Sequence, residues 1–177
     1  MNKKLIALTI LAGSAFSIAA HAADGTINFT GTIMDAACNV TTATQNQTVP
    51  LGNVHRTAFS AAGDTAAPTK FSIILENCPT TVTKATVRFD GPIDSVNKTL
   101  LALTPAGSGA TNATGVAVGI YEDDAVTQIP IATKSKDFAL SSTANNELEF
   151  IAKYVSTAAA VTQGTANAST NFTIDYQ

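Results

Sequence analysis

The chain has no tryptophan and is poor in histidine, cysteine and aromatic side chains. Of its 177 residues two are His and two are Cys, and 6% are aromatic. A histidine-dependent active site therefore has only His21 and His55 to draw on. No group of Cys and His residues has the spacing that a zinc site needs. These shortages exclude most common enzyme classes before any motif is considered.

Charge is also scarce. Charged residues make up 13% of the chain, the formal net charge is −3, and no basic cluster occurs. A protein that binds nucleic acid normally concentrates lysine and arginine on one surface. No nucleic-acid partner is therefore expected.

The first 22 residues are typical of a secretory signal peptide. Lys3 and Lys4 precede an apolar stretch over 5–20, and Ala20-His21-Ala22 fits a small-x-small cleavage site. A transmembrane anchor is the alternative, but the apolar stretch is short for a spanning helix and polar chain follows. Cleavage after Ala22 predicts a mature chain of 23–177 with eight basic and 13 acidic residues, a net charge of −5.

The two cysteines, Cys38 and Cys78, predict one disulfide, because an exported protein folds in an oxidising compartment. Two buried free thiols, or a metal pair, are the alternatives. Closing a loop of about 40 residues stabilises a fold by up to roughly 3–4 kcal/mol in the chain-entropy account.

Composition and periodicity both favour β structure. There are 27 threonines, whose β-branched side chains suit a pleated sheet. Short segments of alternating polarity recur between turn residues, about nine in all, as in an all-β sandwich of one domain. The predicted strands are 27–34, 48–51, 54–59, 70–77, 82–89, 99–103, 115–121, 126–132 (at an edge, because of Pro130), 147–155 and the C-terminal segment. The predicted surface loops are 61–68, 104–114 and 141–146.

Few residues offer chemistry. His55 is predicted to be a solvated loop residue, although a general base is the functional alternative. Glu122-Asp123-Asp124 lacks the spacing of a calcium loop and is predicted to be a solvated hairpin turn. Glu147 and Glu149 share the polar face of their strand. No catalytic residue, cofactor or metal site is predicted.

Both ends of the mature chain have the period of two that marks a half-buried strand. At the C-terminus Ala166, Ala168, Thr170, Phe172, Ile174 and Tyr176 share one face. Near the N-terminus the shared face holds Gly25, Ile27, Phe29, Gly31 and Ile33. The two ends could pair within one monomer. Alternatively, each could pair with another chain, which would extend a sheet from one molecule into the next.

Several stretches resemble the structural subunits of type 1-like fimbriae, which are assembled by the chaperone–usher pathway. A glycine fourteenth from the end, Gly164, and a penultimate aromatic, Tyr176, are the most specific matches. The other matching stretches are G-T-I-N-F-T-G-T-I (25–33), A-A-C-N-V (36–40), V-P-L-G-N-V (49–54), F-S-I-I-L-E-N-C (71–78), G-V-A-V-G-I-Y (115–121) and L-E-F-I-A-K-Y (148–154).

The resemblance implies an incomplete immunoglobulin-like sandwich that lacks its last strand. A periplasmic chaperone would lend a strand beside Phe172, Ile174 and Tyr176. At the outer-membrane usher, the N-terminal segment of the next subunit would replace it and build a cell-surface filament. Gly25 would then take the position where a larger side chain does not fit the groove.

This comparison divides the chain into a signal peptide (1–22), a donor-strand extension (23–35) and a pilin domain (36–177). A minor or adaptor subunit is an alternative within the same family. A small carbohydrate-binding adhesin is an alternative of another class, although the chain has no tryptophan to stack on a sugar.

Overall fold

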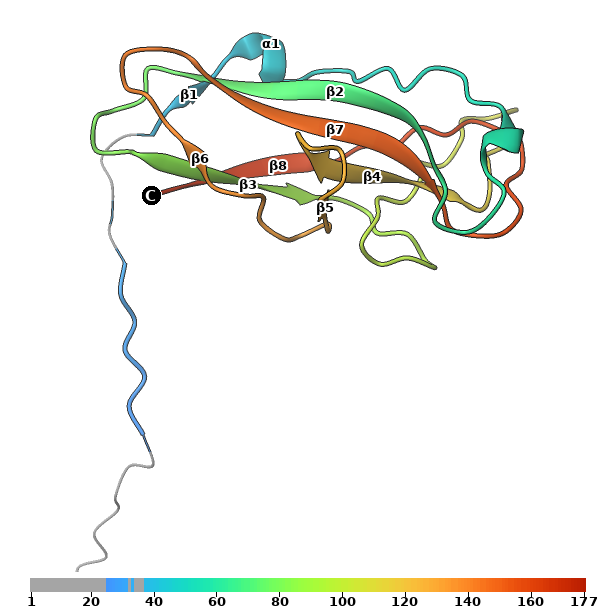
Figure 1. Cartoon of the computed structure of the whole chain (residues 1–177), viewed down its shortest axis with the longest axis horizontal. Coiled ribbons are helices and arrows are strands. Elements are labelled where there is room, and N and C mark those ends of the chain that lie inside the picture. Colours follow the sequence, from blue (N-terminus) through green and yellow to red (C-terminus); the bar gives the residue numbers. More distant parts are fainter. Residues whose placement is uncertain (1–24, 32, 34–36) are drawn as a thin grey trace, which may run out of the picture. The chain divides into compact units, whose positions relative to one another are not determined.

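Eight strands make up nearly all the regular structure in the part of the chain that this computed structural model describes, residues 25–31, 33 and 37–177 (Figure 1). The predicted signal peptide lies outside these residues. Residues 1–33 and 34–177 form separate units, so each is described by itself. The elements are β1 (Asn39–Val40), α1 (Thr42–Gln45), the 3-10 turn η1 (Arg56–Ala58), β2 (Thr65–Glu76), β3 (Lys84–Asp90), β4 (Val116–Glu122), β5 (Gln128–Ile129), β6 (Phe138–Ala139), β7 (Asn146–Ser156) and β8 (Asn171–Tyr176).

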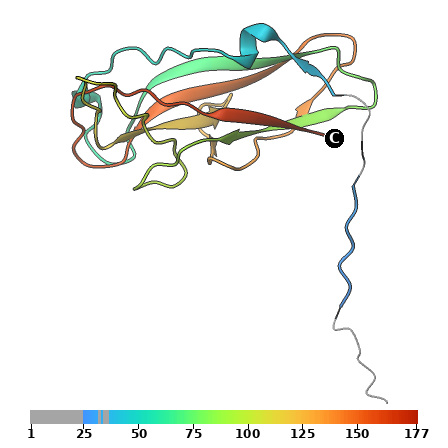
Figure 2. The same cartoon turned by 180° about the vertical axis from the view of Figure 1, so that it is seen from behind.

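The strands form two facing sheets, as the sequence predicts (Figures 1 and 2). One sheet has the order β1-β2-β7-β4-β5, and the other has the order β6-β3-β8. Every pair of neighbouring named strands is antiparallel. The fold class is thus an all-β sandwich, and β8 lies at the outer position of the smaller sheet.

Aromatic rings fill the space between the sheets. Phe89 of β3 and Phe150 of β7 are fully buried, with ring centroids 5.1 Å apart in an edge-to-face arrangement. Phe71 and Phe138 pack against the same ring of Phe150. The predicted disulfide is present and buried, and it joins Cys38, just before β1, to Cys78, just after β2.

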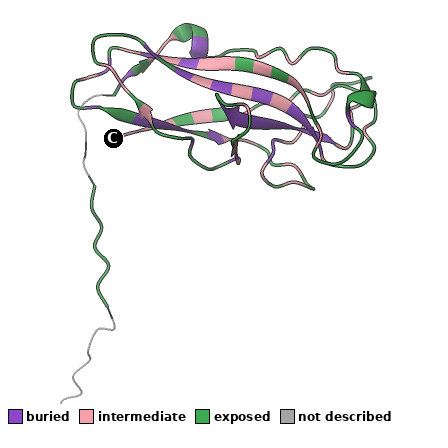
Figure 3. Ribbon diagram, in the orientation of Figure 1, coloured by how far each residue is buried: buried purple, intermediate pink, exposed green. Residues whose placement is uncertain are grey.

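The outer face of the larger sheet carries a second apolar cluster over β4. It consists of Leu100, Ala117, Tyr121 and Val155. Gly119 makes this packing possible, because a Cβ there would lie 2.8 Å from the Tyr121 ring and 3.1 Å from Leu100. As a result every residue of β4 is buried (Figure 3).

The structure corrects two predictions near β2. Residues 61–68 are not a loop throughout, because β2 begins at Thr65 and continues across a register shift between Ala66 and Thr69. Ala67 has φ 52° at this irregularity, which hides the strand period. Residues 48–51 and 54–59 form no strand, and the second of these ranges contains η1.

Other predicted strands are shorter than expected. Residues 99–103 form only isolated bridges, such as Leu101 with Val118. The edge strand at 126–132 is reduced to β5, and it does lie at a sheet edge. The described residues of 27–34 adopt no strand. The short elements β1, α1 and β6 were not predicted, and Asn146 begins β7 rather than ending a loop.

Among the described residues no helix is long and apolar enough to cross a membrane.

Candidate functional site

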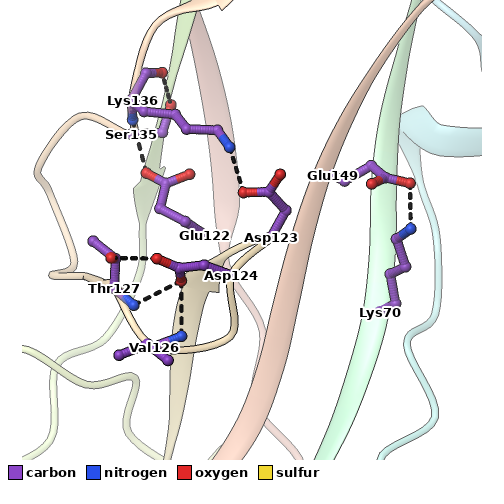
Figure 4. Close-up of polar contacts among 9 residues, drawn as sticks. All are labelled: Lys70, Glu122, Asp123, Asp124, Val126, Thr127, Ser135, Lys136 and Glu149. Carbon is purple, nitrogen blue, oxygen red and sulfur yellow. Dashed lines mark hydrogen bonds and ion pairs between the residues drawn. The ribbon is translucent and has the colours of Figure 1, made fainter.

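The carboxylate cluster at the end of β4 plays a structural role. Glu122 is only 5% exposed, which corrects its predicted position in a solvated turn. Its Oε1 accepts a hydrogen bond from the Lys136 backbone N–H at 2.7 Å, and its Oε2 has no partner among the described residues (Figure 4). Burial raises the pKa of this carboxyl, because a charged form is poorly solvated there.

The next two acids do occupy the predicted hairpin turn. Asp124 accepts hydrogen bonds from the Thr127 hydroxyl and from the N–H groups of Val126 and Thr127, and these lower its pKa to about 2. Asp123 pairs with Lys136. Within the described residues no group of three metal-ligating side chains gathers. The cluster therefore ties β4 to its neighbours rather than forming a reactive site.

His55 is exposed, as predicted for a loop residue. Its Nδ1 lies 2.7 Å from the Thr57 hydroxyl, and the ring caps the first turn of η1. No carboxylate in the described part of the chain hydrogen-bonds to it. The arrangement stabilises the first turn of η1.

The feature that stands out is the open edge of β8. The strand pairs with β3 from Ala85↔Tyr176 to Asp90↔Asn171, and the described residues provide no strand on its other side. No residue of β8 is fully buried, although Phe172, Ile174 and Tyr176 point toward the core cluster. In Figure 2, β8 (red) runs along the border of its sheet to the C-terminus. Its outward backbone groups are thus available for pairing.

A groove of about 1080 Å³ lies beside this edge and reaches down to the core. Ile73, Phe89, Val118 and Ile120, which are core residues of the sandwich, form part of its floor. One wall is formed by 166–172 with Ile174 and Tyr176, and the other by 37–38, Val40 and 44–52. The groove therefore lies where one further strand would close the two sheets.

The two walls meet at one end through the last aromatic residue. The Tyr176 hydroxyl donates a hydrogen bond to the Cys38 carbonyl oxygen at 3.2 Å. The disulfide holds Cys38 in place from the other side. The penultimate aromatic residue that the sequence singled out therefore joins the C-terminal strand to the opposite wall.

A second, smaller hollow of about 520 Å³ continues the groove beyond its other end. Tyr154 and Ala166 line both hollows, and the Tyr154 hydroxyl donates to the Ala166 carbonyl oxygen at 2.9 Å. Arg56, Phe59 and Val161 are among the other lining residues of this hollow. The ring of Tyr154 thus lies at the junction between the two hollows.

Gly164 has a steric reason to be glycine. A Cβ there would lie 2.3 Å from the Ala113 nitrogen and 2.5 Å from the Thr111 carbonyl oxygen. The next residue, Thr165, accepts a hydrogen bond from the Ala113 N–H. This close packing anchors the chain segment that leads into β8 along the rim of the second hollow.

The N-terminal segment 25–33 presents its apolar side chains to solvent. Ile27, Phe29 and Ile33 are 80%, 91% and 99% exposed. Its described residues form no helix or strand. A segment with alternating large apolar side chains and no regular structure has surface to bury in a partner.

The residues that the sequence assigned to a groove strand lie at the two hollows. Phe172, Ile174 and Tyr176 line the first, and Gly164 lines the second. That a chaperone or a donor strand binds beside them stays a prediction. Tyr154 and the irregular stretch 44–52 were not assigned to the groove. The latter has no periodicity that could reveal a wall, although the V-P-L-G-N-V motif falls partly within it.

Comparisons with known proteins agree on one family. A family model described as "Fimbrial protein" matches residues 27–177. Long polar fimbria protein A of Salmonella typhimurium is 41% identical over 98% of this chain and 94% of its own length. A fimbrial subunit type 1 of the same organism is 37% identical over the full length of both.

Solved structures give the same result. A type I fimbria protein of Burkholderia pseudomallei has 39% identity and a TM-score of 0.60, with 86% of this chain and 97% of that chain covered. The P pilus rod subunit PapA shares the fold with a TM-score of 0.65 at 22% identity, covering 80% of this chain and all of that one.

Proposed function

The chain belongs to the fimbrial protein family, and from that premise we propose that it is a structural subunit of a cell-surface fimbrium. Each subunit would insert its segment 25–33 into the groove of the next subunit and receive another segment in its own. The observation that carries the proposal is the groove with an apolar floor beside the unpaired edge of β8. A head-to-tail contact of this kind does not close on itself, so it generates a filament.

The segment and the groove are complementary in chemistry and length. Nine extended residues span about 30 Å, comparable to the wall that runs from Ala166 to Tyr176. Ile27 and Phe29 would each contribute roughly 1.5–3 kcal/mol on full burial. The backbone of the donor would also satisfy the open N–H and C=O groups of β8.

The donor would run antiparallel to β8. All paired strands of the sandwich are antiparallel to their neighbours, and the antiparallel ladder is slightly more stable per residue. Gly25 would then lie near Tyr176, and Ile33 would lie near Ala168, toward the other end of the groove. The close approach that the family resemblance suggested for Gly25 stays a prediction.

The same groove gives a physical reason for assembly through a chaperone and an usher. An unfilled groove leaves the apolar residues of β8 only half-buried, so a periplasmic chaperone would occupy it until the outer-membrane usher exchanges it for the next donor. Export would remove 1–22, leaving 23–35 as the donor extension and 36–177 as the pilin domain. The subunit would have both a donor and a groove, which suits a position within the filament shaft. Its role would be structural and adhesive rather than catalytic.

A charge placed on the inward face of the donor tests this function. We expect Phe29→Asp to abolish filaments while leaving the domain folded, because the carboxylate would have to enter an apolar groove. Asn28→Asp is the matched control, since it adds the same charge on the opposite face and should assemble. The measurement is sheared filament per cell, alongside soluble periplasmic subunit. Normal filaments from Phe29→Asp would contradict the proposal.

A further inference from the structure

The outward face of β8 carries one charge beside the open edge of the strand. Asp175 alone among the six residues of β8 is charged, and its side chain is 40% exposed. Ile174 and Tyr176 on either side of it pack toward the core, so Asp175 points away from the groove. Residues 25–33 of the donor contain no charged side chain. A donor strand beside β8 would therefore meet a carboxylate and bring no charge of its own.

Lys134 holds this carboxylate from the other side of β3. Its Nζ lies 3.1 Å from Asp175 Oδ2. Lys134 forms an antiparallel bridge with Arg88 along one edge of β3. Asp175 pairs with Thr86 along the other edge, so the ion pair crosses the strand, and Thr86 is only 3% exposed although it points away from the core. The ion pair thus orients the carboxylate, whose second oxygen, Oδ1, has no hydrogen bond in the described part of the chain.

The shape of the groove favours one register of the donor. At one end Tyr176 reaches the opposite wall through its hydroxyl group, so its side chain crosses the groove. Gly25 would fit beside this ring because it has no side chain. Ile27 and Phe29, the next two residues of the inward face, would then lie beside the two half-buried apolar residues of β8 that precede Tyr176. A shift of two residues would place Ile27 against the Tyr176 ring instead.

In this register Thr26 of the donor would lie directly opposite Asp175 on the outward face, and Asn28 would lie opposite the neutral Thr173. Opposed Cβ atoms of an antiparallel pair are about 5 Å apart, which brings a threonine hydroxyl within reach of Oδ1. We propose that Asp175 accepts a hydrogen bond from Thr26 of the neighbouring subunit and thereby selects the register of the inserted strand. This inference rests on the proposed function. An acidic side chain at position 26 would face a carboxylate and would be disfavoured.

The test is a set of charge changes in filaments assembled by cells from the full chain. Thr26→Asp should increase the rate of filament dissociation in denaturant by about five-fold, because like charges directly opposite each other destabilise a strand pair. Thr26→Asn has the size of the aspartate without its charge and should stay close to the wild-type rate. Asn28→Asp is the matched control for charge, because it faces Thr173, and it should also stay close to the wild-type rate.

Removal of the opposing charge provides the second half of the test. In an Asp175→Asn background, Thr26→Asp should no longer accelerate dissociation. Lys134→Gln leaves Asp175 without its counter-charge and should enlarge the effect of Thr26→Asp. The amount of soluble periplasmic subunit, measured for every variant, shows whether folding is affected.

The possible results separate the claims. Absence of wild-type filaments would remove the proposed function itself. Wild-type filaments with an unaltered Thr26→Asp rate would overturn the pairing alone, as would an equal acceleration in the Asp175→Asn background. A larger effect of Asn28→Asp than of Thr26→Asp would overturn the register. If Thr26→Asp yields no filaments, their return with Asp175→Asn would support the pairing, and their continued absence would overturn it.

Discussion

Strands β4 and β8 differ in how completely the fold surrounds them. All seven residues of β4 are buried, with the sandwich core on one face and the Leu100–Tyr121 cluster on the other. Its two edges pair with β5 and β7. In contrast, β8 pairs on one edge, and its apolar residues are only half-buried. The first strand is complete within one chain, and the second has its remaining contacts available for another molecule.

The contrast predicts that an Ile→Ala substitution lowers the free energy of unfolding by different amounts on the two strands. In an unassembled Phe29→Asp background, Ile120→Ala should lower the free energy of unfolding by about 2–5 kcal/mol, as for a buried side chain. Ile174→Ala should lower the free energy of unfolding by less than half as much as Ile120→Ala. Denaturant unfolding of the soluble subunit gives both values.

Assembly should remove this difference. Once a donor strand covers Ile174, its truncation should weaken filaments about as much as Ile120→Ala weakens the isolated domain. Filament dissociation in denaturant is the measurement. If Ile120→Ala and Ile174→Ala lower the free energy of unfolding of the unassembled chain equally, β8 is already fully packed.

The disulfide links the closed part of the sandwich to the groove wall, and its removal is the next largest effect. Replacing both Cys38 and Cys78 with serine should lower stability by up to about 3–4 kcal/mol and reduce periplasmic yield. Wild-type protein with and without reductant provides the control. If both stability and yield remain unchanged, the bridge is not formed in the cell.

A smaller effect concerns Glu122 at the end of β4. Its raised pKa means that the folded state holds the proton more tightly, so the contribution of Glu122 to stability is fully present below the unfolded value near 4.5 and is lost as pH rises through the folded pKa. Glu122→Gln should remove this contribution to the pH dependence of stability above about pH 4.5. Asp124→Asn is the control, because the lowered pKa of Asp124 affects stability only below about pH 4. An unchanged slope in Glu122→Gln would contradict the assignment.

The sequence predicted the strands whose alternation is unbroken. The central parts of β2, β3, β4, β7 and β8 follow from their period of two, and the disulfide follows from the export signal and the cysteine count. Predictions from the sequence were wrong where tertiary contacts determine the local structure. The irregularity at Ala67 interrupts the period of two at the start of β2. Glu122 is buried at a place where its carboxylate accepts a hydrogen bond from the Lys136 backbone, a contact distant in sequence.

Only part of the groove lining has a regular strand period. Phe172, Ile174 and Tyr176 belong to β8, whereas the 44–52 wall begins in α1, continues as irregular chain and is held by long-range bonds, such as Ile74 N–H to the Thr44 hydroxyl at 3.1 Å.

The central claim is that the sandwich lacks one strand and that the N-terminal segment supplies it. Thermal unfolding of two purified monomers tests this directly: the mature chain without residues 23–35, and the same chain with residues 24–35 joined after Gln177 through a short flexible linker. Burial of Ile27, Phe29 and Ile33 should raise the melting temperature by more than about 10 °C. If both chains melt at the same temperature as stable monomers, the sandwich is already complete and the account is wrong.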